Sequence, residues 1–212
     1  MNMKNRAILF ANGQVTEREI AISRKTAFDM VVAADGGIVH AERFGFVPDA
    51  VVGDFDSLPP DSRKRFPGTR FVHQPSEERC DLEKTLIFCE KERISAITLL
   101  GVTGKRLDHT LGNLSLLIRY DRRFSLRILT PEAEVFIVRD SIKLDGIPGQ
   151  GISLLPMEEA EEVSTSGLKY PLSCETLAFG QREGTSNEFS DSCCSISISG
   201  GLLFVFRLYP EN

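Results

Sequence analysis

The chain has 212 residues, of which 42% are hydrophobic, so it can bury one large core or two smaller ones. A formal net charge of −5, without a local cluster of lysine and arginine, disfavours a nucleic-acid partner. No apolar run approaches the roughly 20 residues that span a bilayer, so we expect no membrane partner and a cytoplasmic location. The five irregularly spaced cysteines indicate reduced thiols, and neither a disulfide framework nor a zinc site.

The first part of the chain, residues 1–130, alternates short apolar runs with segments of helical periodicity. This alternation is typical of a parallel sheet with helices on both faces, so we expect a Rossmann-like α/β domain. The pattern predicts strands at 7–10, 30–34, 50–52, 69–72, 96–100 and 126–129. It predicts helices at 23–28, 38–45, 59–66, 81–93 and 106–123, with single apolar faces formed by Leu82, Leu86 and Cys89 and by Leu107, Leu111, Leu114 and Ile118.

The second part of the chain, residues 131–212, contains short β-rich runs separated by Gly, Pro, Ser and acidic residues, with no convincing helix. These runs include 132–140, 141–146, 151–157, 161–172, 175–180 and 192–210. This pattern predicts an all-β sandwich as a second domain.

Acidic residues follow successive predicted strands of the first domain. Asp35 follows the second strand, Asp54 and Asp56 follow the third, and Asp81 and Asp108 follow the next two. Taken singly, each could serve as a helix cap or a turn residue. Ligands of open parallel sheets bind at the carboxyl ends of the strands, where five carboxylates would repel one another unless a cation binds. Oxygen ligands of this kind suit Mg²⁺, so we expect a magnesium site.

Groups that suit phosphate follow the same strands. Gly36 and Gly37 allow close approach of backbone, and residues 101–106 form a glycine-containing loop before a helix N-terminus, which favours anions. Lys84, Lys105 and Arg106 add positive charge, and the fork of Arg106 suits bidentate phosphate contacts. Neither a dinucleotide-binding nor a Walker motif is present. Together the acids, cation site and anion loop indicate phosphoryl-type transfer from a nucleotide.

Several motifs resemble, in order and spacing, those of thiamine pyrophosphokinases. They are "ADGG" (34–37), "FGFVPDAVVGDFDSL" (44–58), "CDLEKTL" (80–86), "GVTGKRLDHTLGNLSLL" (101–117) and "GTSNEF" (184–189). The resemblance implies a catalytic α/β domain, a thiamine-binding β-sandwich, and a homodimer with active sites at the subunit interface. It also implies Mg²⁺-dependent transfer of the diphosphoryl group of ATP to the hydroxyl of thiamine, giving thiamine diphosphate and AMP.

Carried over residue by residue, the resemblance implies a set of site residues. The catalytic set would be Asp54, Asp56, Asp81, Asp108 and Arg106, of which Asp54, Asp56 and Asp81 would bind Mg²⁺. The nucleotide would contact Asp35, Gly36, Gly37, Lys84, Thr103 and Gly104, and Ser186 and Asn187 would face thiamine. One acid among Asp54, Asp56 and Asp81 would accept the proton of the thiamine hydroxyl. Asn12, after the first strand, either contacts the nucleotide or forms a plain turn.

This chain departs from the family pattern at two places. Cys80 stands where family members usually have Thr or Ser, so a hydroxyl contact to phosphate or metal is missing. The chain also has no tryptophan, on which some relatives stack their substrate rings. Tyr170 or Phe189 could provide a cation–π contact to the thiazolium instead, although Phe189 could equally pack in the core.

Two other functions compete with this interpretation. The "DFDS" segment also resembles the first motif of haloacid dehalogenase-like phosphatases, in which Asp54 would be the nucleophile and Asp56 the acid/base. That family has its motif after the first strand, whereas two predicted strands precede Asp54 here, and Asp35 stays unexplained. A non-enzymatic binding module is the third reading, but it has no need for so many acids beside a phosphate site.

Overall fold

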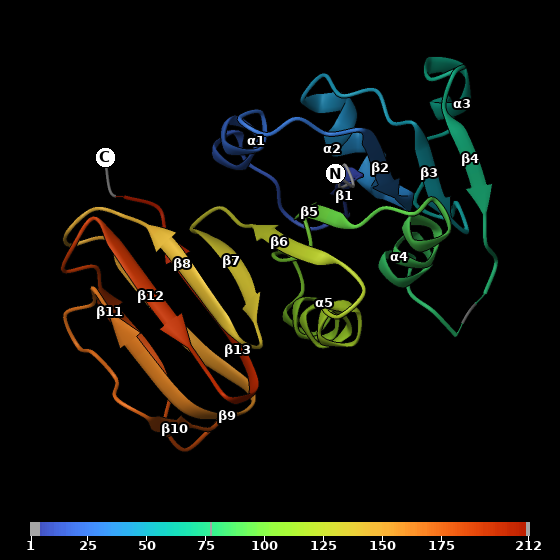
Figure 1. Ribbon diagram of the computed structural model, residues 1–212. Helices are drawn as coiled ribbons and strands as arrows, with labels where there is room; N and C mark the ends of the chain where they lie inside the picture. The colour runs from blue at the N-terminus through green and yellow to red at the C-terminus, as the bar shows by residue number, and fades with distance from the viewer. Residues whose placement is uncertain (1–4, 77, 211–212) are drawn as a thin grey trace. The chain divides into compact units, whose positions relative to one another are not determined.

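Two units follow one another along the chain and divide between Pro131 and Glu132. The computed structural model describes residues 5–76 and 78–210, which Figure 1 colours from blue at the N-terminus to red at the C-terminus. Strands and helices alternate in the first unit, whereas antiparallel strands build the second. The predicted α/β class is therefore confirmed. None of the described helices is long and apolar enough to cross a bilayer.

The strands of the first unit form a parallel sheet. Their bounds are β1 Arg6–Phe10, β2 Met30–Ala34, β3 Ala50–Gly53, β4 Arg70–His73, β5 Ala96–Leu100 and β6 Ser125–Leu129. Their order across the sheet is β4-β3-β2-β1-β5-β6. The side chains of β1 and β3 are almost all buried, as expected where a parallel sheet is covered on both faces. From β1, the chain adds β2, β3 and β4 on one side and then returns to add β5 and β6 on the other side. Open α/β sheets bind ligands at such a reversal of strand order.

Helices connect these strands. Their bounds are α1 Glu17–Ser23, α2 Ile38–Arg43, α3 Ser62–Arg65, α4 Asp81–Lys91 and α5 Leu107–Tyr120, with a 3-10 helix, η1, at Asp35–Gly37. In Figure 1, α1 and α2 lie on one side of the sheet and α4 and α5 on the other. Ile20 of α1 and Ile38 of α2 belong to one apolar cluster with Phe10 of β1. Leu82 and Leu86 of α4 are buried, as their spacing predicts.

The helix predicted at residues 23–28 is wrong. The helix of this segment is α1, which ends at Ser23. It begins after Thr16, whose backbone N–H donates a hydrogen bond of 2.8 Å to the Glu19 side chain as part of a capping box. The pair Thr16 and Glu19 is a start signal in the sequence, and it outweighs apolar periodicity here because the apolar pattern of α1 is short.

The apolar residues of α5 do not form one buried face. Leu107 and Leu111 are 72% and 58% exposed, although their spacing puts them on the predicted apolar face. Leu116, Leu117 and Tyr120 are buried instead. Periodicity reveals apolar faces of a helix, but it does not say which of two such faces packs on the core.

Antiparallel strands build the second unit. Their bounds are β7 Ala133–Val138, β8 Ser141–Asp145, β9 Gly151–Ser166, β10 Glu175–Leu177, β11 Gly184–Glu188, β12 Cys193–Ser197 and β13 Gly200–Leu208. The two predicted β runs at 151–157 and 161–172 share one strand of 16 residues, β9, which pairs with β10, β11, β12 and β13. Leu154 of β9, Ile196 of β12 and Val205 of β13 meet in one core cluster, which also contains Phe189.

Two glycines give a matched test of packing in the first unit. A Cβ atom on Gly37 would lie 2.0 Å from the backbone oxygen of Phe10, whereas a Cβ on Gly112 of α5 meets nothing within 4 Å. We expect Gly37→Ala to lower the free energy of unfolding by more than about 2 kcal/mol because η1 must move away from β1. Gly112→Ala should raise it by up to about 1 kcal/mol through helix propensity. Urea unfolding measures both, and a wild-type midpoint for Gly37→Ala would contradict this packing.

Candidate active site

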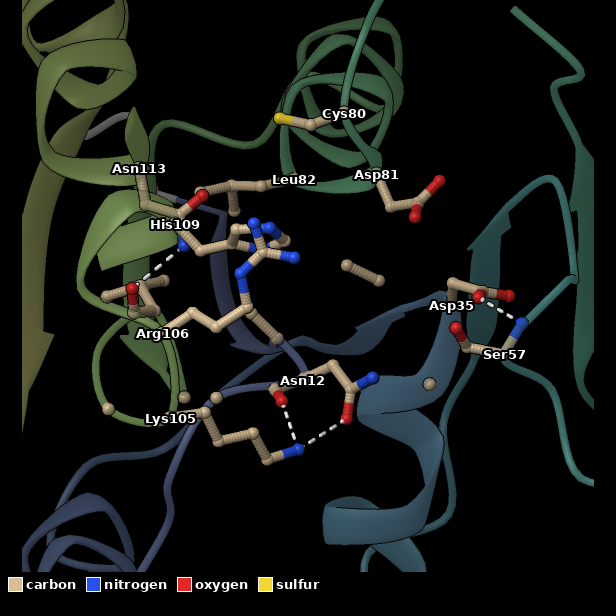
Figure 2. A pocket seen from close by; sticks show the side chains of 17 residues that line it. Asn12, Asp35, Ser57, Cys80, Asp81, Leu82, Lys105, Arg106, His109 and Asn113 are labelled. Atoms are coloured by element: carbon tan, nitrogen blue, oxygen red, sulfur yellow. Dashed lines mark hydrogen bonds between the residues drawn. The ribbon is translucent and has the colours of Figure 1, made fainter. Parts of the chain in front are cut away.

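A cavity of about 340 Å³ lies at the carboxyl ends of the parallel strands of the first unit. Ala11 and Asn12 reach it from the end of β1, Asp35 from the end of β2, and Gly101 from the end of β5. The cavity therefore lies where the direction of strand addition reverses, as expected for a ligand site in this kind of sheet. Figure 2 shows Asp35, Asp81 and Ser57 on one side of the cavity and Arg106, His109 and Asn113 on the other.

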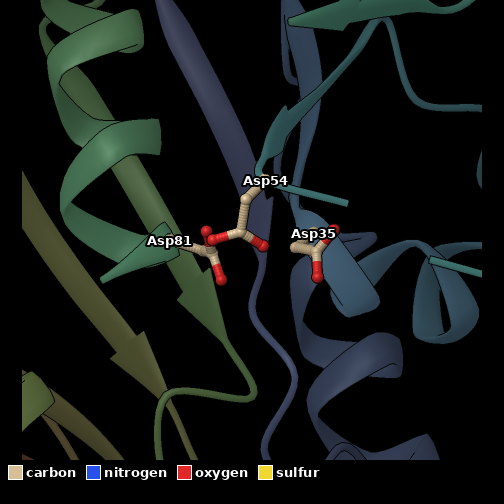
Figure 3. A group of neighbouring side chains, drawn as sticks. All are labelled: Asp35, Asp54 and Asp81. Atoms are coloured by element: carbon tan, nitrogen blue, oxygen red, sulfur yellow. The ribbon is translucent and has the colours of Figure 1, made fainter. Parts of the chain in front are cut away.

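Three carboxylates meet beside this cavity, as Figure 3 shows. Asp35, Asp54 and Asp81 each have an oxygen atom within 4.8 Å of an oxygen of the other two. Asp35 opens η1, Asp54 follows β3 and Asp81 opens α4, so three separate connections contribute. We call these residues the acid cluster. The structure thus brings together three of the five acids that the sequence placed at strand ends.

Asp35 is the most buried member of the acid cluster, with 2% of its surface exposed. Its Oδ2 atom accepts a hydrogen bond of 3.0 Å from the backbone N–H of Ser57. Its Oδ1 atom is buried and has no hydrogen-bond partner among the described residues. Burial raises the pKa of Asp35 to about 6, helped by the charges of Asp81, Asp56 and Asp54 and opposed by the Ser57 hydrogen bond. A buried carboxylate oxygen without a donor is a suitable ligand for a cation, so the acid cluster fits Mg²⁺.

Lys84 partly neutralises the acid cluster. Its side chain is 2% exposed, and its Nζ atom donates hydrogen bonds to Asp54 Oδ2 at 2.8 Å and to Asp81 Oδ1 at 3.0 Å. The hydrogen bond from Lys84 lowers the pKa of Asp54. Three ionised carboxylates and one ammonium leave a charge of −2, which a divalent cation would balance. Lys84, which we expect to contact the nucleotide, pairs with two acids of the cluster in the structure.

Asp56 lies outside the acid cluster because the chain turns sharply between the two aspartates. Phe55 has a φ of +73°, in the left-handed region that bulky residues rarely adopt. Its ring centroid lies 5.3 Å from that of His73 and 6.1 Å from that of Phe71, and this packing holds the turn. Asp56 is exposed, and its Oδ1 accepts a hydrogen bond of 2.9 Å from the Ser57 hydroxyl.

Asp108 also lies outside the acid cluster. Arg106 and Asp108 are exposed at the start of α5, where Arg106 Nε donates a hydrogen bond of 3.1 Å to Asp108 Oδ1. The Arg106 side chain lowers the pKa of Asp108 to about 2. Arg106 lines the cavity, so its guanidinium could exchange Asp108 for a phosphate group.

Two loops are joined at the base of the cavity. The Gly13 N–H donates to the Gly101 oxygen at 2.6 Å, and the Gln14 N–H donates to the Thr103 oxygen at 2.8 Å. Of the residues predicted to contact the nucleotide, Asn12, Asp35, Gly36 and Gly104 line the cavity. Thr103 uses its backbone oxygen in the loop contact, and Gly37 packs against the backbone of β1.

Sequence reasoning missed two residues that line the cavity, His109 and Asn113. They lie four residues apart on α5, so they share one face of the helix. The Nδ2 atom of Asn113 donates a hydrogen bond of 2.8 Å to the Val102 backbone oxygen, which ties α5 to the loop after β5. The spacing of His109 and Asn113 after Arg106 is a signal that could have identified both.

Ser186 and Asn187 lie on β11 of the second unit, in different surroundings. Ser186 is exposed with a φ of +59°, within an irregular stretch of the β11–β9 pairing. Asn187 is 7% exposed; its Oδ1 accepts from the Tyr170 N–H at 3.0 Å, and its Nδ2 donates to the Tyr170 oxygen at 2.7 Å. Asn187 therefore holds the backbone of Tyr170, whose side chain is exposed. Phe189 is buried in the core.

Comparisons with known proteins agree for both units. The family model "Thiamin pyrophosphokinase, catalytic domain" matches residues 24–130, and "Thiamin pyrophosphokinase, vitamin B1 binding domain" matches residues 139–203. The thiamine pyrophosphokinase of Bacillus subtilis is 29% identical over 189 residues, covering 83% of this chain and 86% of its own. Thiamin pyrophosphokinase 1 of Caenorhabditis elegans is 29% identical over 199 residues, covering 84% and 78%.

A solved structure shows the same fold over almost the whole chain. The crystal structure of thiamin pyrophosphokinase from Geobacillus thermodenitrificans superposes with a TM-score of 0.83 at 25% identity. The alignment covers 98% of this chain and 99% of that one.

The burial of Asp35 predicts a dependence of stability on pH. With a pKa of about 6 in the folded state and 3.8 as its ordinary value, Asp35 holds a proton in the folded chain that the unfolded chain releases. The free energy of unfolding should therefore fall as the pH rises through this interval. In buffer with a chelator, Asp35→Asn should be more stable than wild type at about pH 7.5, by roughly 1 to 3 kcal/mol, and similar at about pH 4.

Chemical unfolding at the two pH values checks this difference, with the exposed Asp61→Asn as the control. Added Mg²⁺ should raise the midpoint of wild type and leave that of Asp35→Asn nearly unchanged. A stability difference between Asp35→Asn and wild type that is equal at both pH values would contradict the burial cost.

Proposed function

Because the chain belongs to the thiamin pyrophosphokinase family, we propose that the cavity of its first unit is where the diphosphoryl group of ATP is transferred to thiamine. The activity is that of a thiamine diphosphokinase, with thiamine diphosphate and AMP as products. One observation supports this location for the reaction. Three carboxylates, one of them with a buried unpaired oxygen, meet beside a cavity that is lined by glycine-containing loops and Arg106. Such a set suits a metal-bound polyphosphate and has no evident structural use.

We propose that the acid cluster holds Mg²⁺. Asp35 offers its unpaired Oδ1, while Asp54 and Asp81 each keep one oxygen that Lys84 does not bind. When bound, the ion supplies neutralisation of phosphate charge in the transition state. Asp56, which the sequence placed among the ligands, lies outside the cluster but contributes to the negative field at Asp35.

Side chains of the protein would bind the phosphate oxygens and accept the proton of the attacking hydroxyl. Arg106 would leave Asp108 and bind phosphate oxygens with its fork, while Asp108 keeps it near the cavity in the absence of nucleotide. The proton of the attacking hydroxyl would pass to one acid among Asp54, Asp56 and Asp81. The hydrogen bond from Lys84 lowers the pKa of Asp54, which makes Asp54 a weaker base than an ordinary aspartate.

The second unit would supply the thiamine site. Ser186 presents an exposed hydroxyl in a strained backbone position, which is a frequent feature of functional sites. Asn187 would support this site through its bonds to Tyr170, whose exposed ring could contribute about 0.5 to 2 kcal/mol of cation–π energy with the thiazolium. We accordingly propose a Rossmann-like nucleotide domain over 1–130 and a thiamine-binding sandwich over 131–212.

The phosphohydrolase alternative is not supported. Both family models that match the chain describe thiamin pyrophosphokinase domains. The "DFDS" segment follows β3, the third strand of the chain order, and not the first. Asp54, the proposed nucleophile of that reading, is paired with the buried Lys84 and belongs to the acid cluster.

We further propose a homodimer in the cytoplasm. Leu107 and Leu111 are exposed one helical turn apart on α5, beside Arg106, and a second copy of the chain would cover them there. All five cysteines are free thiols, which suits a reducing compartment.

Incubation with ATP, Mg²⁺ and thiamine tests the proposed function. AMP should form only when thiamine is present, and a phosphate monoester should yield no free phosphate. Release of phosphate from the monoester without thiamine-dependent AMP would favour the phosphohydrolase.

Asp54→Asn tests the acid cluster in the same assay. The amide keeps the shape of the side chain but removes a charge from the cluster, so turnover should fall at least about a hundredfold while the melting temperature stays similar. Asp61→Asn, which changes an exposed aspartate of the same unit, serves as the control and should keep full activity. Near-normal turnover of Asp54→Asn would remove this residue from the site.

Cys80→Thr tests the departure from the family pattern. Cys80 lines the cavity and precedes α4 as its N-cap residue, where its side chain makes no capping hydrogen bond. A threonine hydroxyl can cap the helix, so the variant should be more stable by up to about 1 kcal/mol, with equal or higher activity. Thermal unfolding and the AMP assay measure the two effects. A large loss of activity would show that the thiol itself has a role.

A further inference from the structure

Lys105 and Asn12 form a pair at the rim of the cavity, drawn with two dashed lines in Figure 2. The Nζ atom of Lys105 donates to the backbone oxygen of Asn12 at 2.6 Å and to its side-chain Oδ1 at 3.1 Å. Both residues line the cavity, although they belong to loops more than 90 positions apart in the sequence. The lysine therefore turns back toward the protein, and its charge is directed at a neutral residue.

This contact determines which way the Asn12 amide points. A lysine ammonium has only donors, so the atom facing it must be the amide oxygen and the NH₂ group must face away. No described residue accepts a hydrogen bond from that NH₂ group. Asn12 thus offers the cavity a donor without a charge.

Gly36 locates this donor. A Cβ atom on Gly36 would lie 2.5 Å from Asn12 Nδ2, so the amide nitrogen lies against the glycine next to Asp35. Figure 2 shows the amide nitrogen of Asn12 pointing to the side of the cavity that holds Asp35 and Ser57. The donor therefore faces the region where the acid cluster would hold a metal-bound polyphosphate.

An unusual backbone conformation brings Lys105 to Asn12. Lys105 has a φ of +58° and follows Gly104 with a φ of +85°, so two consecutive residues are left-handed. Left-handed backbone is unfavourable for lysine and persists only where other contacts maintain it. Those contacts include the bond between Gln14 N–H and the Thr103 oxygen, which joins the two loops next to the pair.

We propose that Lys105 is a positioning residue, which orients Asn12 so that its amide NH₂ donates a hydrogen bond to a phosphate oxygen of ATP. The proposal rests on the proposed function of the cavity and adds a neutral donor to it. Lys105 acts through Asn12 and does not itself bind the phosphate.

A double-mutant cycle tests the pair. The dissociation constant of ATP with Mg²⁺, without thiamine, is measured by calorimetry for wild type, Asn12→Ala, Lys105→Met and the double variant. Each single variant should bind about tenfold more weakly, the loss of about one hydrogen bond, and the double variant should be no weaker than the singles. Losses that multiply to about a hundredfold would show an independent phosphate contact of Lys105 and overturn the proposal.

Asn12→Asp gives a second and sharper test. The carboxylate can still accept the Lys105 hydrogen bonds, but it turns an acceptor toward the phosphate in place of the NH₂ donor. ATP affinity should fall at least as far as in Asn12→Ala, and wild-type affinity would overturn the proposal. Lys64→Met removes an exposed lysine of the same unit away from the cavity and should leave the affinity unchanged.

The same samples separate this proposal from the proposed function. Thiamine-dependent AMP formation by wild type tests the function, whereas the ATP titrations test the Lys105–Asn12 pair without any turnover. The KM for thiamine should stay constant in Lys105→Met while the KM for ATP rises. A rise of both by the same factor would point to general loss of structure and contradict a positioning role.

Discussion

The main physical constraint on the site is the electrostatic repulsion among the three partly buried carboxylates of the acid cluster. One carboxylate oxygen from each of Asp35, Asp54 and Asp81 lies within 4.8 Å of the others, and two features of the folded chain reduce the repulsion among them. The buried Lys84 neutralises part of the charge through Asp54 and Asp81, and the raised pKa of Asp35 allows it to stay protonated at lower pH. Neither is complete at neutral pH, so the cluster retains a free energy that only a bound cation would remove. The folding free energy that this repulsion costs would be regained when a cation binds.

Strand order explains why this cluster and the loops after β1 and β5 meet at one cavity. β1 has β2 on one side and β5 on the other, so the loops after β1 and β5 come together although they are far apart in the sequence. Hydrogen bonds from Gly13 to Gly101 and from Gln14 to Thr103 join these loops, and Lys105 adds a third link through Asn12. The loops after β1 and β5 therefore meet the acids that follow β2 and β3 at one cavity.

Much of this could be predicted from the sequence because the signals are local. The bounds of β2 and β5 agree with the apolar runs that predicted them, and Asp81 opens a helix as expected. The predictions failed where a second local signal competed with apolar periodicity, or where tertiary packing decided which face of a helix is buried. The capping box of Thr16 and Glu19 starts α1 earlier than apolar periodicity indicated. Leu111 of α5 is exposed because the helix packs by another of its apolar faces.

By itself the sequence determined which chemistry is present: acids at strand ends, glycine-containing loops and the motifs of a diphosphokinase, all encoded by neighbouring residues. Only the tertiary structure decided which of those residues lie together. Asp35 joins the acid cluster while Asp56 and Asp108 do not, because Phe55 turns the chain between the aspartates and Asp108 lies exposed at the start of α5. Lys84 pairs with acids, Asn187 holds Tyr170, and Lys105 orients Asn12. Side-chain direction and burial arise from contacts between distant segments, and no local pattern specifies them.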